Sequence, residues 1–340
     1  MRIGIVGCGY IAEHQHLPAY KNIEELEIIA LCDVNEQRAK ALSEKFGVPR
    51  TYTEYEKMFE KEDLDIVTVA SIPQFHGPIA MAAANRGINV FCEKPLAMSL
   101  DEANKVVQTA ELNKVKLMVN QNFRWRPEFE AAKKIVDAKL LGEIFYANIE
   151  QFFWNDHFQG SYTMPNIIHE MVVHYIDLLR WLVGREAEKV YALGTNIVKQ
   201  VRIAEYPLAM IMIDFGNDVI GRTDVSWISK GSRVLERGRV EGTQGCILIN
   251  WDRPVAVFTE KFAETMSFFQ SNFVKHGWYY PEINYKSVMS AFERNMRLFI
   301  ECLKTNTEPP TSGRDNLNTL RIVFAAIESL KTKKVVEIVH

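Results

Sequence analysis

Short apolar segments alternate with amphipathic helical segments along the first 120 residues of the chain. Apolar, β-branched runs of this length are typical of strands that are buried on both faces of a sheet. They occur at Ile3–Val6, Leu26–Cys32, Leu64–Ala70, Ile88–Cys92 and Val115–Val119. The strand–helix–strand repetition predicts an α/β fold of the Rossmann type, a doubly wound parallel sheet with helices on both faces.

Polar and glycine signals mark the helices between these strands. Thr53 with Glu56 matches a capping box, in which two side chains satisfy free N–H groups at a helix start. Ser99 with Glu102 matches the same motif. Pro78 is expected at the first helical position, where its missing N–H costs no hydrogen bond. The other helix signals predict a helix up to about Lys21, one over Asn35–Phe46, and helix ends near Gly87 and Asn113.

The pattern changes after residue 120 and predicts a second domain with an α+β architecture. Residues 127–140 are expected to be helical, and residues 167–183 form a strongly apolar helix that ends at Gly184. Expected strands cover residues 143–153, 188–199, 206–215, 218–228, 235–242 and 245–251, and helices at 286–304 and 315–331 precede a short strand at 334–339. Tight turns between strands favour a large, open, mostly antiparallel sheet. We therefore expect residues 1–120 and 121–340 to be separate domains.

Composition and charge exclude several classes of protein. Of the 340 residues, 47% are hydrophobic and 24% charged, which is ordinary for a globular protein. The net charge is −3, and no basic excess favours nucleic acid as a partner. No apolar run is long enough to span a membrane, and the first residues lack an apolar core of signal-peptide length.

Five cysteines are widely spaced along the chain, at Cys8, Cys32, Cys92, Cys246 and Cys302. Their odd number and the lack of a Cys-x-x-Cys pair argue against a disulfide framework or a structural zinc site. We expect them to be small buried residues in the reducing cytoplasm.

A glycine turn follows the first predicted strand. Gly7, Gly9 and Ala12 match the pattern G-x-G-x-x-[G/A], and Asp33 ends the second strand. The first glycine permits a tight turn, the second lets backbone N–H groups approach a pyrophosphate, and the following helix N-terminus favours phosphate charge. A carboxylate at Asp33 accepts hydrogen bonds from ribose hydroxyls and repels a 2′-phosphate, so NAD is expected rather than NADP. Arg38, five residues beyond Asp33, is either a contact to an adenine or a phosphate or a solvated helix residue.

More polar residues follow the later parallel strands. Glu93, Lys94 and Pro95 come directly after the fourth predicted strand, and Gln121 and Asn122 follow the fifth. Ligands of doubly wound sheets bind at the carboxyl ends of the strands. These residues are therefore candidates for cofactor and substrate contacts.

Three ionisable residues interrupt the apolar helix at 167–183. Glu170, His174 and Asp177 are spaced i, i+4 and i+7, so in an α-helix they share one face. The pattern fits a catalytic histidine between two acids, or a satisfied internal network. His169 and His174 are five residues apart, about 140° around an α-helix, whereas the helical zinc motif needs histidines at i and i+4. No metal is expected.

These motifs resemble the Gfo/Idh/MocA family, which includes glucose–fructose oxidoreductase and inositol dehydrogenases. The resemblance covers essentially the whole chain, and it rests also on the turn Pro73–His76, on Arg124-Trp125-Arg126-Pro127, and on the helix motif ending His174-Tyr-Ile-Asp177. It implies that Lys94 is catalytic, reaching both the nicotinamide ribose and the reacting hydroxyl, and that Pro95 is often cis. It also implies that His174 and the residue at position 170 lie at the substrate.

The motifs and the resemblance together give the expected site residues. Cofactor contacts are expected from Gly7, Gly9, Tyr10, Ile11, Ala12, Asp33, Arg38, Ser71, Pro73, His76, Glu93, Lys94, Gln121 and Asn122, and substrate contacts from Lys94, Arg124, Trp154, Asn155, Asp156, His157, Tyr162, Glu170 and His174. Glu170 stands where the family usually has Asp, so its carboxylate reaches one methylene further. Arg126 departs from the usual residue before the proline and is expected to be exposed. Aromatic rings beside amides and carboxylates at residues 154–166 suit a carbohydrate.

The resulting hypothesis is a cytoplasmic NAD-dependent dehydrogenase of sugars or polyols. His174 is the expected general base, and Lys94 stabilises the developing alkoxide. Two alternatives remain open: an NAD-dependent glycosidase that acts by transient oxidation and elimination, and a non-catalytic NAD-binding regulator. The expected partners are a small sugar or polyol and further copies of the chain in a dimer or tetramer, with neither nucleic acid nor a membrane.

Overall fold

The structure is a computed structural model that describes residues 1–154, 163–199, 203–231, 235–250, 253–259, 274–275, 278–279 and 290–340. Contacts within the chain divide these residues into two compact units. Residues 1–122 and 290–320 belong to the first unit, and the remaining described residues belong to the second. A segment from near the end of the chain thus returns to the unit built by its beginning.

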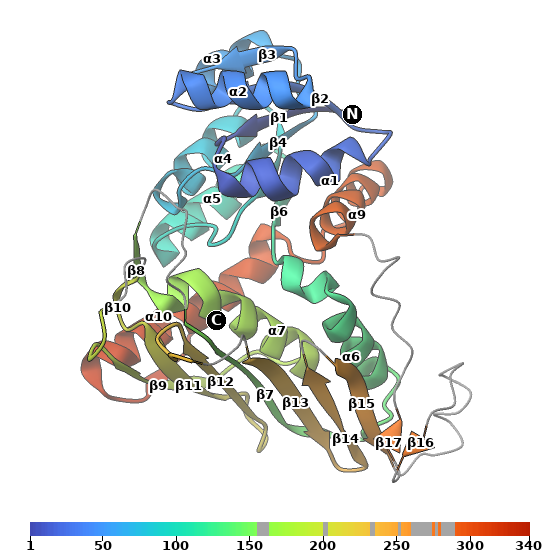
Figure 1. Cartoon of the computed structure of the whole chain (residues 1–340), viewed down its shortest axis with the longest axis vertical. Coiled ribbons are helices and arrows are strands. Elements are labelled where there is room, and N and C mark those ends of the chain that lie inside the picture. Colours follow the sequence, from blue (N-terminus) through green and yellow to red (C-terminus); the bar gives the residue numbers. More distant parts are fainter. Residues whose placement is uncertain are drawn as a thin grey trace. The chain divides into compact units, whose positions relative to one another are not determined.

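A six-stranded parallel sheet forms the centre of the first unit, in the order β3-β2-β1-β4-β5-β6 (Figure 1). Its strands are β1 (Arg2–Val6), β2 (Glu27–Cys32), β3 (Arg50–Tyr52), β4 (Ile66–Val69), β5 (Asn89–Cys92) and β6 (Leu117–Val119). The predicted doubly wound sheet is confirmed. The sequence pattern missed β3, because three residues with a basic side chain and two polar hydroxyls do not form an apolar run. The strand order reverses between β1 and β4, where doubly wound sheets bind ligands.

Helices in the first unit are α1 (Leu17–Lys21), α2 (Glu36–Phe46), α3 (Tyr55–Lys61), α4 (His76–Ala84), α5 (Leu100–Leu112), α9 (Ala291–Thr305) and the first part of α10 (Gly313–Thr332). The capping box at Ser99 is confirmed, since its hydroxyl accepts the N–H of Glu102 at 3.2 Å. The box at Thr53 is wrong: α3 begins at Tyr55 and its N-cap has no side-chain hydrogen bond. Pairing of β3 with β2 keeps the chain extended through Tyr52, so the helix starts later than the motif suggested.

Two further helix starts differ from the expected ones. Pro78 is the third residue of α4, which begins at His76. The position is still in the first turn, where the backbone N–H would have no intrahelical partner. The helix after the glycine turn begins as a π-helical segment, Ala12–His16, that continues into α1.

The second unit is built on a ten-stranded sheet, in the order β16-β17-β15-β14-β13-β7-β12-β11-β9-β18. Its strands are β7 (Ile144–Phe152), β9 (Lys189–Thr195), β11 (Leu208–Asp214), β12 (Ile220–Ser226), β13 (Leu235–Gly242), β14 (Gly245–Asn250), β15 (Arg253–Thr259), β16 (Val274–Lys275), β17 (Trp278–Tyr279) and β18 (Val336–Glu337). Neighbours are antiparallel except β7 and β12, which confirms the predicted mostly antiparallel sheet. A separate parallel pair joins β8 (Met164–Asn166) to β10 (Ile203–Glu205).

Helices cover one face of this sheet (Figure 1). Helix α7 (Val173–Val183) packs against β7 and β12, and α6 (Pro127–Asp137) packs against β14 and β15. The alternation along β11 shows the two faces directly, because Ala209, Ile211 and Ile213 are buried whereas Met210 and Met212 are exposed. On β11 the second face of the sheet therefore exposes apolar side chains.

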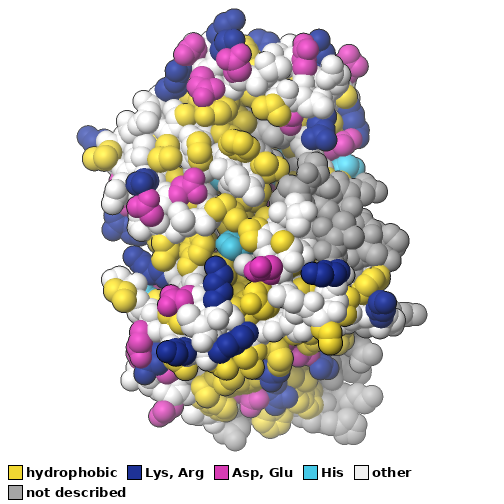
Figure 2. Space-filling view, turned by 90° about the vertical axis from the view of Figure 1, so that its left-hand side faces the viewer, with side chains coloured by type: hydrophobic (Ala, Val, Ile, Leu, Met, Phe, Trp, Pro, Cys, Tyr) yellow, Lys and Arg dark blue, Asp and Glu magenta, His cyan; other side chains and the backbone are white. Residues whose placement is uncertain are grey.

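The five cysteines are free thiols. Cys8, Cys32, Cys92 and Cys302 are buried, as predicted, whereas Cys246 is partly exposed. Burial raises the pKa of the Cys32 thiol to about 12, which keeps it protonated. No helix in the described part of the chain is both long and apolar enough to cross a bilayer. On the face shown in Figure 2, basic and acidic side chains are interspersed.

Candidate active site

The glycine turn leads from β1 into the π-helical segment. Gly7 has a φ of +101°, and a Cβ atom there would overlap the backbone of Ala70. Only glycine fits this position. At Gly9, by contrast, no described atom lies within 4 Å of an ideal Cβ, so the turn faces open space. Ala12 is fully buried, which lets the helix pack closely on the sheet.

Asp33 ties the end of β2 to the glycine turn. Its Oδ2 accepts the backbone N–H of Cys8 at 2.8 Å, and its Oδ1 accepts the N–H of Asn35 at 2.8 Å. Each carboxylate oxygen keeps further accepting capacity for a ligand hydroxyl. Arg38 lies exposed in the first turn of α2, for which Asn35 is the N-cap.

Large apolar side chains are exposed at the carboxyl ends of β1, β2 and β4. Tyr10 and Ile11 of the glycine turn are 51% and 38% exposed. Val34 and Phe75, which belong to no sequence motif described above, are also exposed. Apolar exposure beside an open glycine turn suits a flat, partly apolar ring such as adenine. The residues present therefore fit a dinucleotide.

The turn after β5 presents Lys94. The preceding residue, Glu93, is 9% exposed, and its Oε1 contacts His16 Nε2 at 2.7 Å and accepts Asn120 Nδ2 at 2.6 Å. Its Oε2 accepts the backbone N–H of Lys94 at 3.3 Å. Burial by itself raises the pKa of a carboxyl group, but at Glu93 the hydrogen bonds and charge of His16 and the other donors lower it below its ordinary value. Glu93 is thus a buried carboxylate beside the candidate catalytic lysine.

Pro95 completes this turn, and the Lys94–Pro95 peptide is cis, as the resemblance implied. His76 lies between this turn and the one after β4: its Nδ1 is 2.7 Å from the carbonyl oxygen of Pro95, and its Nε2 is 3.0 Å from that of Ser71. Pro73 is buried in a short 3₁₀ helix, Pro73–Phe75. The cofactor residues expected from the β4 and β5 turns therefore lie together.

The residues after β6 extend the same edge. Gln121 is 1% exposed, and neither its Oε1 nor its Nε2 has a hydrogen-bond partner among the described residues. Buried amides are normally hydrogen-bonded. An unpaired amide at this edge is suited to a polar group of a ligand. Asn122 begins a 3₁₀ helix, Asn122–Trp125.

In the second unit, Arg124 and Asp177 form a buried, bidentate ion pair. The Nε and Nη2 atoms of Arg124 donate to the two carboxylate oxygens of Asp177, both at 2.7 Å. The side chains are 4% and 1% exposed. This ion pair anchors α7. Asp177 therefore has a structural role, unlike the roles expected for Glu170 and His174 on the same helix.

Glu170 and His174 are buried as well, at 6% and 5% exposure. The imidazole of His174 stacks on Phe123, with ring centroids 4.1 Å apart and planes 5° from parallel. Phe123 holds the ring orientation, yet no polar or spacing signal in the sequence pointed to it.

The backbone around Glu170 differs from the expected α-helix. Residues Ile168–Val172 form a π-helical segment, and α7 begins only at Val173. The i, i+4, i+7 spacing was argued for an α-helix throughout, and the π-helical segment changes the rotation per residue between Glu170 and His174. Short π-helical segments inside helices often occur at functional sites.

Arg126 is not exposed as expected. Its side chain is 12% exposed, donates to Glu128, and donates to Glu236 at 2.7 Å. Its guanidinium also stacks over Phe123. The basic residue is tolerated before the proline because two buried carboxylates compensate its charge.

The substrate loop is only partly described. Trp154 forms an isolated bridge with Ile228, and the ammonium of Lys230 lies 4.9 Å from its ring. The other predicted contacts in this loop, Asn155, Asp156, His157 and Tyr162, lie outside the described residues.

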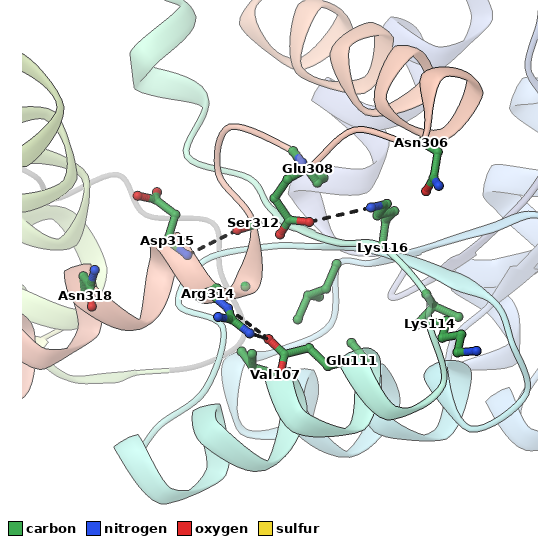
Figure 3. A pocket seen from close by; sticks show the side chains of 15 residues that line it. Val107, Glu111, Lys114, Lys116, Asn306, Glu308, Ser312, Arg314, Asp315 and Asn318 are labelled. Atoms are coloured by element: carbon green, nitrogen blue, oxygen red, sulfur yellow. Dashed lines mark hydrogen bonds and ion pairs between the residues drawn. The ribbon is translucent and has the colours of Figure 1, made fainter. Parts of the chain in front are cut away.

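A surface pocket of about 790 Å³ lies at the amino end of β6, away from the carboxyl edge (Figure 3). Helix α5, the start of β6 and residues 306–318 line it. Its charged side chains include the ion pairs Arg314–Glu111 and Lys116–Glu308. The pocket is therefore distinct from the candidate site.

Known proteins match both units. A family model described as "Oxidoreductase family, NAD-binding Rossmann fold" matches residues 1–121, and the GFO/IDH/MocA C-terminal domain matches residues 129–248. D-apiose dehydrogenase of Paraburkholderia graminis is 29% identical over 98% of this chain and 88% of its own length. Myo-inositol 2-dehydrogenase of Thermotoga maritima is 25% identical over 99% and 98%.

Solved structures share the fold over the full chain. An oxidoreductase from Agrobacterium radiobacter, solved with NAD+, L-tartaric acid and magnesium, superposes with a TM-score of 0.87 at 25% identity, covering 99% of this chain and 98% of that one. A levoglucosan dehydrogenase with NADH has a TM-score of 0.87 at 19% identity, covering 100% and 99%, and shows the shared fold.

The fold and the carboxyl-edge residues thus define an oxidoreductase with an NAD-binding Rossmann domain. The chain belongs to the Gfo/Idh/MocA family.

Proposed function

We propose that this protein is an NAD-dependent dehydrogenase that interconverts a secondary alcohol of a sugar or polyol with its ketone. The turn that presents Lys94 beside the buried carboxylate of Glu93, at the carboxyl edge of the NAD-binding sheet, carries the proposal. The relatives named D-apiose dehydrogenase and myo-inositol 2-dehydrogenase support the substrate class.

The dinucleotide is proposed to bind along the carboxyl edge of the first unit. Gly7 and Gly9 admit the pyrophosphate, and Tyr10 and Ile11 offer apolar contacts. Asp33 accepts ribose hydroxyls and disfavours a 2′-phosphate, so NAD is preferred over NADP. The bound nicotinamide supplies the hydride acceptor and donor that protein side chains lack.

The protein side chains transfer the proton of the substrate hydroxyl and stabilise the negative charge on its oxygen. In the oxidative direction, His174 accepts the proton of the substrate hydroxyl, while the Lys94 ammonium donates a hydrogen bond to that oxygen and stabilises its negative charge. The C–H bond gives up its hydride and a C=O bond forms. In the reductive direction the same groups return the proton to the oxygen. Glu170 orients His174 or a substrate hydroxyl.

The substrate is proposed to be uncharged, which agrees with the small net charge of −3 and with the interspersed charges on the face shown in Figure 2. The residues proposed to contact it, besides Lys94, His174 and Glu170, are Arg124, Trp154, Asn155, Asp156, His157 and Tyr162.

A homo-oligomer is proposed to form through the open face of the ten-stranded sheet. Leu193 on β9 pairs with Met210 on β11, and Met212 follows on the same face. All three are at least 40% exposed. Apolar side chains gathered on an open sheet are typical of a covered interface.

The activity test is an assay with NAD and a panel of sugars and polyols, including D-apiose, myo-inositol and levoglucosan. Oxidation of a panel member should raise absorbance at about 340 nm, where reduced nicotinamide absorbs. Glycoside cleavage without net NADH would instead show a glycosidase. Bound NAD with neither activity would show a regulator.

Two variants test the assigned roles. Lys94→Ala and His174→Ala should each lower kcat by about a hundredfold or more, because each removes charge stabilisation or proton transfer. The Kd of NAD, measured by fluorescence titration, should change little. Turnover near the wild-type value in either variant would remove that residue from the mechanism.

A further inference from the structure

Two buried histidines lie on either side of the turn that presents Lys94. His16 is 0% exposed and ends the π-helical segment that follows the glycine turn, and His76 is 1% exposed at the start of α4. The function proposed above uses neither side chain. A buried histidine is normally fixed by its hydrogen bonds, so its partners show what it holds.

His16 belongs to a chain of buried hydrogen bonds that ends at Glu93. Thr68 Oγ1 is 2.9 Å from Tyr20 Oη, which is 3.0 Å from His16 Nδ1. His16 Nε2 is 2.7 Å from Glu93 Oε1. A carboxylate only accepts, so Nε2 donates to Glu93, while Nδ1 lies within hydrogen-bond distance of the Tyr20 hydroxyl. Tyr20 and Thr68 thereby hold the imidazole of His16 in place from its Nδ1 side.

A second branch holds the same carboxylate from the other side. Asn295 of α9 donates to Asn120 Oδ1 at 2.6 Å, and Asn120 Nδ2 donates to Glu93 Oε1 at 2.6 Å. Both asparagines are fully buried. With Oε1 held by two donors, Oε2 of Glu93 is directed to the backbone N–H of Lys94.

His76 holds the residue that follows Lys94. Burial lowers the pKa of His76, so at neutral pH the ring is uncharged and has one N–H. The shorter of its two contacts is 2.7 Å, from Nδ1 to the carbonyl oxygen of Pro95, and a carbonyl oxygen only accepts. His76 thus binds the backbone on one side of Lys94 while Glu93 binds it on the other.

We propose that His16 and His76 are positioning residues for Lys94. His16 acts through the carboxylate of Glu93 on the N–H of Lys94, and His76 acts on the carbonyl of Pro95. The proposal rests on the proposed catalytic role of Lys94. Lysine has a long, flexible side chain, so the geometry of its ammonium depends on a fixed backbone. A displacement of about 1 Å in such a group can lower the rate about a hundredfold.

Paired variants separate hydrogen bonding from side-chain volume. His16→Leu and His76→Leu remove the donors, whereas His16→Gln and His76→Asn place an amide N–H near the original nitrogen. We expect the leucine variants to lower kcat by about thirtyfold and the amide variants by about threefold, with the Kd of NAD changed by less than about threefold. His340→Leu, in the second unit, is the matched control and should keep wild-type kcat.

A double-variant cycle tests whether His16 acts through Lys94. If it does, adding His16→Leu to Lys94→Ala should lower kcat no further than Lys94→Ala alone. If instead the fold-decreases in kcat of the two single variants multiply in the double variant, the proposal is overturned and His16 is a purely structural residue. If His16→Leu does not fold, His16→Asn, whose amide is too short to reach Glu93, takes its place in the cycle.

Amide hydrogen exchange in the protein without NAD gives a readout independent of activity. Loss of His16 should release Glu93 and accelerate exchange of the Lys94 N–H by about tenfold, while the Val119 N–H, bonded to Thr311, stays unchanged. Unchanged Lys94 exchange would overturn the proposal. If Lys94→Ala keeps wild-type turnover but exchange accelerates as expected, the positioning contact stands and the proposed catalytic role of Lys94 fails.

Discussion

The carboxylate of Asp33 has a structural role within the protein and a proposed role in binding the nucleotide. It accepts the N–H groups of Cys8 and Asn35, so it helps to shape the glycine turn in addition to its proposed role in selecting the ribose. The sequence predicted only the second role, because the position after the second strand is the usual place for a ribose-binding acid. The bond to Cys8 depends on how β1 and β2 pair, which the pattern of the sequence does not specify.

Substitution at Asp33 can separate these two roles. Asp33→Asn keeps an oxygen for Cys8 and removes the charge, so we expect NAD to bind less tightly and the preference for NAD over NADP to fall by about tenfold. Asp33→Ala should weaken the binding of both cofactors further, because the glycine turn loses the side chain that accepts the Cys8 N–H. Kd values for NAD and NADP from fluorescence titration check this. An unchanged preference in both variants would place the 2′ selectivity elsewhere.

His169 has a different environment from its neighbour His174. It is buried against Phe324, and its Nδ1 is 3.0 Å from the Oδ1 of Asn166. Burial, followed by the charge of Lys331, lowers its pKa to about 4. The unfolded chain binds the proton with a pKa near 6.5, so the stability that His169 contributes is present above about pH 6.5 and is lost as the pH falls toward 4.

The unfolding free energy should therefore fall between pH 6.5 and 4, with a contribution from His169 of about 3 kcal/mol. His169→Asn keeps a donor for Asn166 and cannot titrate, so its pH dependence should be flatter by that amount. Urea unfolding followed by tryptophan fluorescence measures it, since all six tryptophans occur in residues 125–278. His340→Asn is the control. Parallel curves for wild type and His169→Asn would contradict the assignment.

At the scale of elements, the helix that carries His174 shows what periodicity can and cannot predict. Its apolar character and its end at Gly184 were read correctly, because burial and a left-handed C-cap leave clear sequence signals. The π-helical segment Ile168–Val172 was missed, since one widened turn changes no residue type. The partner of Asp177 was missed for another reason: Arg124 is fifty-three positions away along the chain.

The Arg124–Asp177 pair fixes α7 to the 3₁₀ helix Asn122–Trp125. Asp177→Leu leaves a buried guanidinium without its carboxylate and should destabilise the second unit by about 3–5 kcal/mol. The double variant Arg124→Met/Asp177→Leu should recover most of that loss, because it removes both charges. Urea unfolding followed by tryptophan fluorescence measures the three free energies. A double variant as unstable as the single one would show that the pair is not what holds the helix.

At the scale of the whole molecule, the sequence predicts the two types of sheet but not the path of the chain between the two units. Alternating patterns predicted a parallel sheet followed by an antiparallel one, and both are present. The return of residues 290–320 to the first unit was not foreseen, because a helix pattern does not state which sheet it joins. The same limit hid His16 and Asn295, whose importance lies in contacts with Glu93 and Asn120.

The open sheet face gives a prediction at this scale. Met210→Glu with Met212→Glu places two charges on the exposed face of β11 without touching its buried side chains. If copies of the chain associate through this face, the double variant should have the mass of a smaller assembly in sedimentation velocity. Met210→Gln with Met212→Gln is the uncharged control. An unchanged mass would place any interface elsewhere.

The outer edge of strand β6 is hydrogen-bonded by residues from near the end of the chain, and this affects how the protein folds during synthesis on the ribosome. β6 is the last strand of its sheet, and its outer edge is bonded by residues that emerge much later: Val119 donates to Thr311, and Met118 pairs with Ser312. Until then the nascent first unit has a bare edge, which is a template for pairing with other chains. Translation of the intervening residues is thus a period of exposure to aggregation, which ends when Thr311 and Ser312 arrive.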